Sequence, residues 1–249
     1  MATVPLRFFG RRKGKGLTPS RQRLLDNLLP KVSITKEKAK KIQKSFGVPV
    51  NQVWLEVGFG GGEHLAELAF QNPNVGIIGA EPFINGVASL LAYLNGSHRY
   101  PHDDLGLEQG RTDNVRIWPD DIRLLFPLFP DKVFNRIFVL YPDPWPKSRH
   151  AERRFINATN LPELYRLLAD NGELIVATDV IGYADWVKEQ MVLFNKFSQV
   201  NPDQHQPPAD WVSTRYEQKG IKAGRQPNYF IFCKKSKKVL DGKKKIAQD

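Results

Sequence analysis

The sequence predicts an α/β fold with a mostly parallel central sheet covered by helices on both faces. From residue 51 onward, apolar runs of strand length alternate with helical patterns. The strand runs are apolar along their whole length, as expected for strands that are buried on both faces of a parallel sheet. In addition, a glycine-rich turn at residues 58–62 separates the first strand pattern from the first helix pattern.

The individual elements are predicted in chain order from their apolar patterns. A helix is expected first, over residues 35–46. Strands are then expected over residues 52–58, 74–81, 114–118, 133–141, 172–179, 197–200 and 227–234. The intervening helices are expected over residues 63–71, 84–95, 156–169 and 183–195. The stretch 96–113 is polar and long for a connection, which favours a surface insertion.

The net charge of +11 is concentrated at the two ends of the chain. Residues 1–25 hold seven Lys or Arg and no acid, and residues 234–249 hold seven Lys against two Asp. The segment between them is close to neutral. Such blocks are either solvated ends or arms that bind a polyanion, and the charge alone does not separate these two possibilities.

The composition argues against several classes of protein. Cys233 is the single cysteine, so neither a disulfide framework nor a thiolate metal site is expected, and the five histidines show no metal-ligand spacing. No apolar run approaches the roughly 18–20 residues of a membrane helix. The N-terminal residues lack the apolar core of a secretory signal, although their Arg-rich, acid-free composition also fits a transit peptide. We expect no metal, no membrane association and a reducing, cytoplasmic location.

The stretch LEVGFGGGEH points to a ligand at the end of the first strand. Gly58 and Gly60 allow a tight turn and a close approach of the backbone to a ligand. A dinucleotide fingerprint would need a glycine at position 63, where Glu63 stands. Glu56, before the turn, would repel a pyrophosphate but suits a cationic ligand. The pattern therefore favours S-adenosylmethionine, which carries an ammonium and a sulfonium, over NAD.

Further acids follow the second and third strands. Glu81 ends the second strand, where doubly wound folds place a carboxylate that accepts hydrogen bonds from ribose hydroxyls. After the third strand, Asp120 or Asp121 could accept a hydrogen bond from an adenine amine. Each of these has a plainer alternative, since Glu81 could be a solvated strand-end acid and either Asp could cap a helix.

The loop YPDPWPKSRHAERRF at residues 141–155 leaves the carboxyl end of the fourth strand, where open α/β sheets bind substrate. Its prolines fix φ and would hold Asp143 and Trp145 in place before a ligand arrives. An acid beside an aromatic ring suits a purine, which the ring stacks on. The alternative is a structural Pro-rich corner with a buried Trp. The cations that follow would bind flanking phosphates, or else form a solvated helix start: Arg149, His150, Arg153 and Arg154.

LEVGFGGGEHL, YPDPWPKSRHAERR, ATD at 177–179 and TRYEQKG at 214–220 together resemble the tRNA (guanine-N7-)-methyltransferase family, in its bacterial single-subunit type. The resemblance covers roughly residues 50–233. It implies a Rossmann-like S-adenosylmethionine-dependent methyltransferase fold. It also implies methyl transfer to N7 of a guanine in tRNA, conventionally at position 46 in the variable loop, with no obligatory protein partner. The methyltransferase domain is then expected over residues 35–233, between a basic arm (1–34) and a Lys-rich tail (234–249).

The same resemblance assigns roles to individual residues. The expected catalytic residue is Asp143. The expected cofactor-binding residues are Glu56, Gly58, Gly60, Glu81, Asp121 and Asp143, with Asp121 chosen over Asp120 from its spacing to Asn114. The expected substrate contacts are Lys147, Asp179, Thr214, Arg215, Tyr216 and Glu217. The residues expected to lie along RNA are Arg149, His150, Arg153 and Arg154.

The chemistry of the reaction agrees with these residue types. Guanine N7 has a lone pair and no proton, so attack on a methyl group needs no strong base there. The product is a cationic purine, which carboxylates stabilise; Asp143 is therefore expected to orient and stabilise rather than to remove a proton. The alternatives are a methyltransferase that acts on another RNA, on DNA or on a protein, and a non-catalytic RNA-binding relative. The sequence does not indicate which tRNAs are accepted or the oligomeric state.

Overall fold

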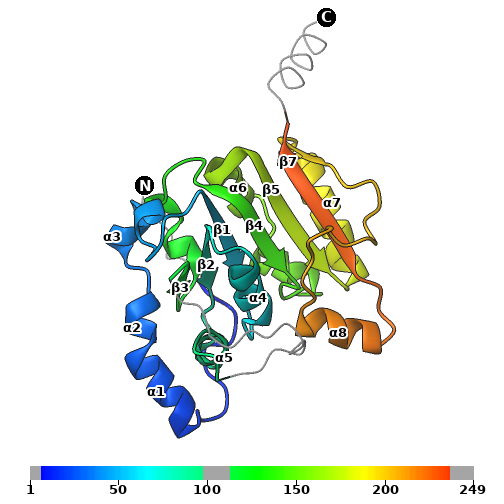
Figure 1. Cartoon of the computed structure of the whole chain (residues 1–249). Helices are drawn as coiled ribbons and strands as arrows, with labels where there is room; N and C mark the ends of the chain where they lie inside the picture. The colour runs from blue at the N-terminus through cyan, green and yellow to red at the C-terminus, as the bar shows by residue number, and fades with distance from the viewer. Residues whose placement is uncertain (1–6, 98–112, 236–249) are drawn as a thin grey trace, which may run out of the picture.

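The computed structural model describes residues 7–97 and 113–235 and shows one twisted sheet between two layers of helices (Figure 1). The strand order is β3-β2-β1-β4-β5-β7-β6. The strands are β1 (Gln52–Val57), β2 (Val75–Ala80), β3 (Val115–Trp118), β4 (Phe134–Leu140), β5 (Leu168–Thr178), β6 (Phe197–Gln199) and β7 (Asn228–Lys234). Strands β1 to β5 are parallel to one another, and β7 is antiparallel to both β5 and β6. The predicted mostly parallel sheet is confirmed.

Helices cover both faces of the sheet (Figure 1). Their bounds are α1 (Pro19–Asn27), α2 (Leu29–Val32), α3 (Lys36–Ala39), α4 (Glu63–Gln71), α5 (Ile84–Leu94), α6 (Asn160–Leu167), α7 (Ile181–Phe194) and α8 (Arg215–Lys222). One hydrophobic cluster lies between the sheet and α6 and α7. A second lies between the opposite face and α4 and α5. None of the helices in the described ranges is both long and apolar enough to cross a membrane.

The boundary between α6 and β5 differs from the prediction of a helix over 156–169 and a strand from 172. The helix starts later because the Asn157 side chain accepts a hydrogen bond from the Asn160 N–H at 2.8 Å and fixes the preceding turn. It ends earlier because Leu168 is already paired with Phe134 of β4, across an irregularity in the ladder. A bulge of this kind leaves no clear signal in the sequence pattern.

The residues before β1 are more structured than predicted. α1 and α2 were not expected, although Thr18 caps α1 and Pro19 occupies its first turn, as helix starts favour. Val32 and Ile34 are buried in the two clusters, and the Ile34 N–H donates to the Ile117 carbonyl at 2.9 Å. The last residues of the predicted basic arm, Val32 and Ile34, are thus part of the core, and the domain bounds stay a prediction.

The helix predicted over 35–46 was wrong as a single element. It is the short α3 followed by a 3₁₀ turn at Ile42–Lys44, because Lys41 leaves the helical region at φ −134° and ψ 45°. Nearly all of the predicted insertion 96–113 and of the Lys-rich tail lies outside the described residues.

Candidate active site at the carboxyl ends of the parallel strands

A cavity of about 510 Å³ opens where β1, β2, β3 and β4 end. This volume lies within the range of roughly 300–1,000 Å³ that is usual for small-molecule sites. Most of its lining comes from the turns that follow these four strands. The predicted site residues among the lining are Gly58, Gly60, Glu81, Asp121, Asp143, Arg153 and Tyr216.

The glycine-rich turn after β1 needs its glycines for conformation and for space. Gly58 and Gly60 have positive φ values of 71° and 57°, which side-chain-bearing residues rarely adopt. A Cβ on Gly60 would also lie 3.0 Å from the Tyr216 ring. The turn therefore presents backbone without side chains to the cavity, and Tyr216 of α8 lies close to it.

Glu81 fastens this turn to the end of β2. Its two carboxylate oxygens accept hydrogen bonds from the N–H groups of Gly60 and Phe83, both at 2.8 Å. Burial raises the pKa of Glu81, and the two backbone N–H groups oppose that shift. Each oxygen keeps a second lone pair, so the carboxylate is able to accept hydrogen bonds from a ligand hydroxyl.

Both aspartates after β3 line the cavity, and each already has a cationic partner. Asp121 Oδ2 lies 2.6 Å from Arg123 Nη2, and its Oδ1 accepts from the Arg123 N–H at 3.0 Å. Asp120 Oδ1 lies 2.8 Å from Arg12 Nη1. The choice between Asp120 and Asp121 for the adenine contact thus stays a prediction.

Glu56 does not line the cavity. It is 2% exposed, and its Oε2 lies 2.8 Å from His64 Nδ1. The imidazole of His64 is itself buried and contacts the rings of Phe138 and Trp211. The structure therefore places Glu56 behind the glycine-rich turn, on the α4 side of the sheet, where a direct cofactor contact through its side chain is not available.

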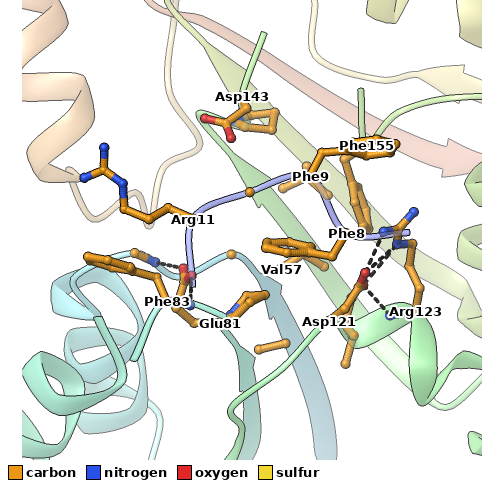
Figure 2. A pocket seen from close by; sticks show the side chains of 18 of the residues that line it. Phe8, Phe9, Arg11, Val57, Glu81, Phe83, Asp121, Arg123, Asp143 and Phe155 are labelled. Atoms are coloured by element: carbon orange, nitrogen blue, oxygen red, sulfur yellow. Dashed lines mark hydrogen bonds and ion pairs between the residues drawn. The ribbon is translucent and has the colours of Figure 1, made fainter. Parts of the chain in front are cut away.

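The loop after β4 presents Asp143 to the cavity (Figure 2). The Asp143 side chain is exposed and makes no hydrogen bond or ion pair with any residue in the described ranges. Tyr141 and Trp145 on either side have positive φ values of 48° and 40°. Non-glycine residues rarely adopt this conformation, and it costs free energy unless surrounding contacts impose it.

Arg154 supplies such contacts, and its predicted place along RNA stays a prediction. Its Nε donates to the Pro144 carbonyl at 3.0 Å, and its Nη2 donates to the Trp145 carbonyl at 3.1 Å. Its guanidinium also lies 4.5 Å from the ring centroid of Trp186 on α7. The side chain is directed into the protein and braces the loop that carries Asp143.

The other cations of the loop lie nearer the surface, in a 3₁₀ helix at Ser148–Arg153. Arg153 stacks over the Trp145 ring at 5.1 Å, and His150 meets that ring edge to face at 5.7 Å. Desolvation, together with the neighbouring cations, lowers the pKa of His150. The side chains of Lys147 and Arg149 are exposed and have no hydrogen-bond or ion-pair partner within the described part of the chain.

Thr214 and Glu217 hold α8 in place, and their expected contact with substrate stays a prediction. The Thr214 hydroxyl accepts from the Glu217 N–H at 3.1 Å, and the Glu217 carboxylate accepts from the Thr214 N–H at 3.2 Å, which makes a capping box. Glu217 is 3% exposed and also accepts hydrogen bonds from Trp211, Ser213 and the Tyr229 hydroxyl. Its carboxylate is fully occupied inside the protein.

The remaining predicted substrate residues lie at the surface near the cavity. Tyr216 lines the cavity and is 50% exposed. Arg215 donates to the Glu63 carboxylate at 2.9 Å, and Asp179 pairs with Arg225 at 2.7 Å. Only Tyr216 among them reaches the cavity itself.

The N-terminal segment also lines the cavity, and the sequence analysis missed it. Phe8, Phe9, Gly10 and Arg11 cross the opening, with Asp143 on one side and Glu81 and Asp121 on the other (Figure 2). The available signal was the sequence RFFGRR, in which an aromatic pair lies among cations, a composition typical of nucleic-acid contacts. No group of three potential metal ligands occurs in the part of the chain that the structure describes.

Comparison with known proteins gives consistent relatives. Residues 50–229 match a protein family described as "Putative methyltransferase". The tRNA (guanine-N(7)-)-methyltransferase of Rhodospirillum rubrum is 44% identical over 248 residues, covering 96% of this chain and 92% of that protein. The enzyme of the same name from Paramagnetospirillum magneticum is 44% identical over 236 residues, covering 93% of this chain and 94% of the relative.

Solved structures are similar in fold. The 16S rRNA methyltransferase KamB superposes with a TM-score of 0.52 at 13% identity, covering 75% of this chain and 89% of that one. The antibiotic-resistance methyltransferase Kmr also gives a TM-score of 0.52 at 13% identity, covering 82% of this chain and 95% of that one. These matches support the methyltransferase fold.

Proposed function

The chain belongs to the tRNA (guanine-N7-)-methyltransferase family, and we propose that it uses the cavity at the carboxyl ends of β1 to β4 to methylate the guanine at position 46 of the tRNA variable loop. The methyl donor is S-adenosylmethionine, the cosubstrate that the family implies. The observation that carries the proposal is the position of Asp143, a carboxylate that lines the cavity and has no hydrogen-bond or ion-pair partner among residues 7–97 and 113–235.

The lining residues fit this cofactor. The bare backbone at Gly58 and Gly60 admits a close ligand, and Glu81 keeps free lone pairs for ribose hydroxyls. Asp120 and Asp121 lie at the end of β3, where the adenine would bind. When bound, the cofactor supplies an electrophilic methyl group on a sulfonium. The predicted role of Glu56 becomes indirect, because it lies behind the turn against His64.

Methyl transfer then needs orientation and charge stabilisation more than acid–base chemistry. The N7 lone pair forms the new bond to carbon, the carbon–sulfur bond breaks, and its electron pair stays on sulfur. Positive charge therefore moves from the sulfur to the purine. Asp143, which lines the cavity, stabilises that charge and accepts hydrogen bonds from the guanine edge. No proton has to leave N7, so Asp143 does not act as a base.

Aromatic and cationic groups beside Asp143 hold the nucleotide. Trp145 lines the cavity and offers a flat surface for the purine. Lys147 and Arg149 are exposed on the same loop and bind the flanking phosphates, which contribute affinity without sequence specificity. Tyr216 lies over the glycine-rich turn and borders the cavity from the side of α8.

Two tRNA transcripts test the proposed function. The purified chain is incubated with radiolabelled S-adenosylmethionine and an unmodified transcript that has guanine at position 46, or adenine there. We expect label in the first transcript alone, recovered as 7-methylguanosine after digestion, without any added protein. Label in both would contradict the position, and label in an unfolded guanine-containing RNA would favour a broader RNA methyltransferase. Absence of label despite cofactor binding would contradict the proposal for the chain acting alone.

A further inference from the structure

The N-terminal segment from Arg7 to Lys15, here called the strap, is tied to both sides of the cavity. On one side, Arg12 Nη1 pairs with Asp120 at 2.8 Å, and Arg123 Nη2 donates to the Arg7 carbonyl at 3.0 Å. These contacts attach the strap to the turn after β3, beside Asp121.

On the other side, the strap is tied to the start of α5. The Ile84 N–H donates to the Arg12 carbonyl at 3.0 Å. The Asn85 side chain bonds the strap twice, accepting from the Gly14 N–H at 2.9 Å and donating to the Lys15 carbonyl at 2.8 Å. The strap thus bridges the two turns that carry the candidate cofactor carboxylates Asp121 and Glu81.

Phe9 connects the strap to the loop that carries Asp143. Its ring meets the Trp145 ring edge to face, with centroids 6.4 Å apart. The Arg153 guanidinium lies 4.6 Å from the Phe9 centroid and 5.1 Å from the Trp145 centroid. Phe9 therefore packs against Trp145, which the proposed reaction needs against guanine, and against Arg153, which stacks on Trp145.

The strap borders the cavity without filling it. About 510 Å³ remains with Phe8, Phe9, Gly10 and Arg11 in the lining. A segment that blocked the site would leave no volume of this size between itself and the strand ends. In Figure 2 the strap passes between Asp143 on one side and Glu81 and Asp121 on the other, so a ligand in this volume would lie against it.

We propose that the strap is part of the active site and covers the bound cofactor. Phe9 is a positioning residue for Trp145 and Arg153. Arg12 holds the strap in place over the cofactor through its ion pair with Asp120. This inference rests on the proposed function for its effect on catalysis. Its effect on cofactor retention can be measured independently of that function. Arg11 of the strap also lines the cavity, so the segment that borders the cofactor pocket brings positive charge to the place where tRNA would bind.

Substitution of Phe9 tests the positioning role. In the full chain, Phe9→Ala is expected to lower kcat at saturating tRNA roughly 10- to 100-fold, as misplacement of a substrate-holding group does. The melting temperature should stay unchanged, because Phe9 is only half-buried. Phe9→Tyr, which keeps the ring, should restore kcat, whereas Phe9→Leu should not. An unchanged kcat in Phe9→Ala would overturn the role, and a raised kcat would show that the strap blocks the site.

Substitution of Arg12 tests whether the strap retains the cofactor, with Lys13→Ala as the matched control. Both variants lose one cation from the strap, but only Arg12 pairs with Asp120 and with the Phe8 ring. We expect Arg12→Ala to release S-adenosylhomocysteine roughly two- to fivefold faster, in line with the loss of an exposed ion pair, and Lys13→Ala to leave the rate unchanged. Equal rates of S-adenosylhomocysteine release in the wild type and Arg12→Ala would overturn the proposal that Arg12 holds the strap over the cofactor. This binding measurement stands even where the wild type fails to methylate tRNA.

Discussion

The loop at residues 141–154 and the strap at residues 7–15 face each other across the same cavity, but they are held in different ways. The loop contains three prolines, and Arg154 fixes two of its carbonyls from inside the protein. The strap is held by hydrogen bonds and an ion pair at exposed positions. The difference separates two tasks: a preorganised loop can place Asp143 for chemistry, while a weakly held strap can lift so that cofactor enters and leaves.

The largest effect is expected from the loop, at Asp143 itself. Asp143→Ala should slow methyl transfer by roughly 10²–10³-fold, as loss of a group that stabilises transition-state charge does. The free energy of unfolding should change by less than about 0.5 kcal/mol, because the side chain is exposed and has no partner in the described residues. Single-turnover methylation and a denaturant titration measure the two quantities. A rate close to that of the wild type would contradict the proposed role.

Arg154→Ala sharpens the claim that the loop is braced from inside. We expect kcat to fall by about 10-fold or more, because the Trp145 backbone loses the contacts that support its positive φ. The dependence of tRNA affinity on salt should not change, since no phosphate contact is lost. Arg154→Lys should not restore the rate, because a lysine ammonium does not have the planar array of N–H donors with which the guanidinium binds the Pro144 and Trp145 carbonyls. A weaker dependence of tRNA affinity on salt, with a normal kcat, would instead show that Arg154 contacts RNA.

Arg149→Ala is the matched control on the same loop, where the side chain is exposed. Loss of one phosphate contact should weaken tRNA binding and reduce the slope of log affinity against log salt by roughly 1. Turnover at saturating tRNA should stay near the wild-type value. Binding titrations at several salt concentrations give the slope, and an unchanged slope would show that Arg149 does not contact RNA.

The smallest effect concerns pH and the cofactor. Burial raises the pKa of Glu81 above its ordinary value of 4.5, so the carboxylate begins to take up a proton at a higher pH than a solvated Glu. Protonation removes acceptor capacity for the ribose, so cofactor affinity should fall as the pH is lowered through that raised pKa. Calorimetric titrations with S-adenosylhomocysteine between neutral and mildly acidic pH measure this. The same loss of affinity in Glu81→Gln would assign it to another group.

The strands could be predicted closely from the sequence because each is a continuous apolar run, and the ends of β1, β2 and β4 correctly placed the turns that line the cavity. The cofactor role of Glu56 stays a prediction, but the alternation of β1 already held a signal for its direction: Val53, Leu55 and Val57 face one cluster, so Glu56 points with Trp54 toward the other. Strand alternation applied to Glu56, the next-to-last residue of β1, would have directed its side chain away from the cavity.

The role of Arg154 could not be predicted, because it depends on partners brought close by the fold. Arg154 differs from Arg149 in sequence only by its position in a cationic run, yet it reaches Trp186 on α7. The spacing of Thr214 and Glu217 fits a capping box and held a signal for part of the role of Glu217, whereas its bonds to Trp211 and to the Tyr229 hydroxyl on β7 have no such local signal. Both are polar residues that the sequence places near a site and that the fold uses to build it.

Hydrogen exchange with and without S-adenosylhomocysteine tests most directly whether the loop is fixed and the strap closes over the cofactor. Without the ligand, the amides of residues 7–15 should exchange quickly, and those of residues 147–155 should be protected. Addition of the ligand should slow exchange in the strap and leave the loop nearly unchanged. Equal slowing of both segments, or no slowing of the strap, would contradict the account.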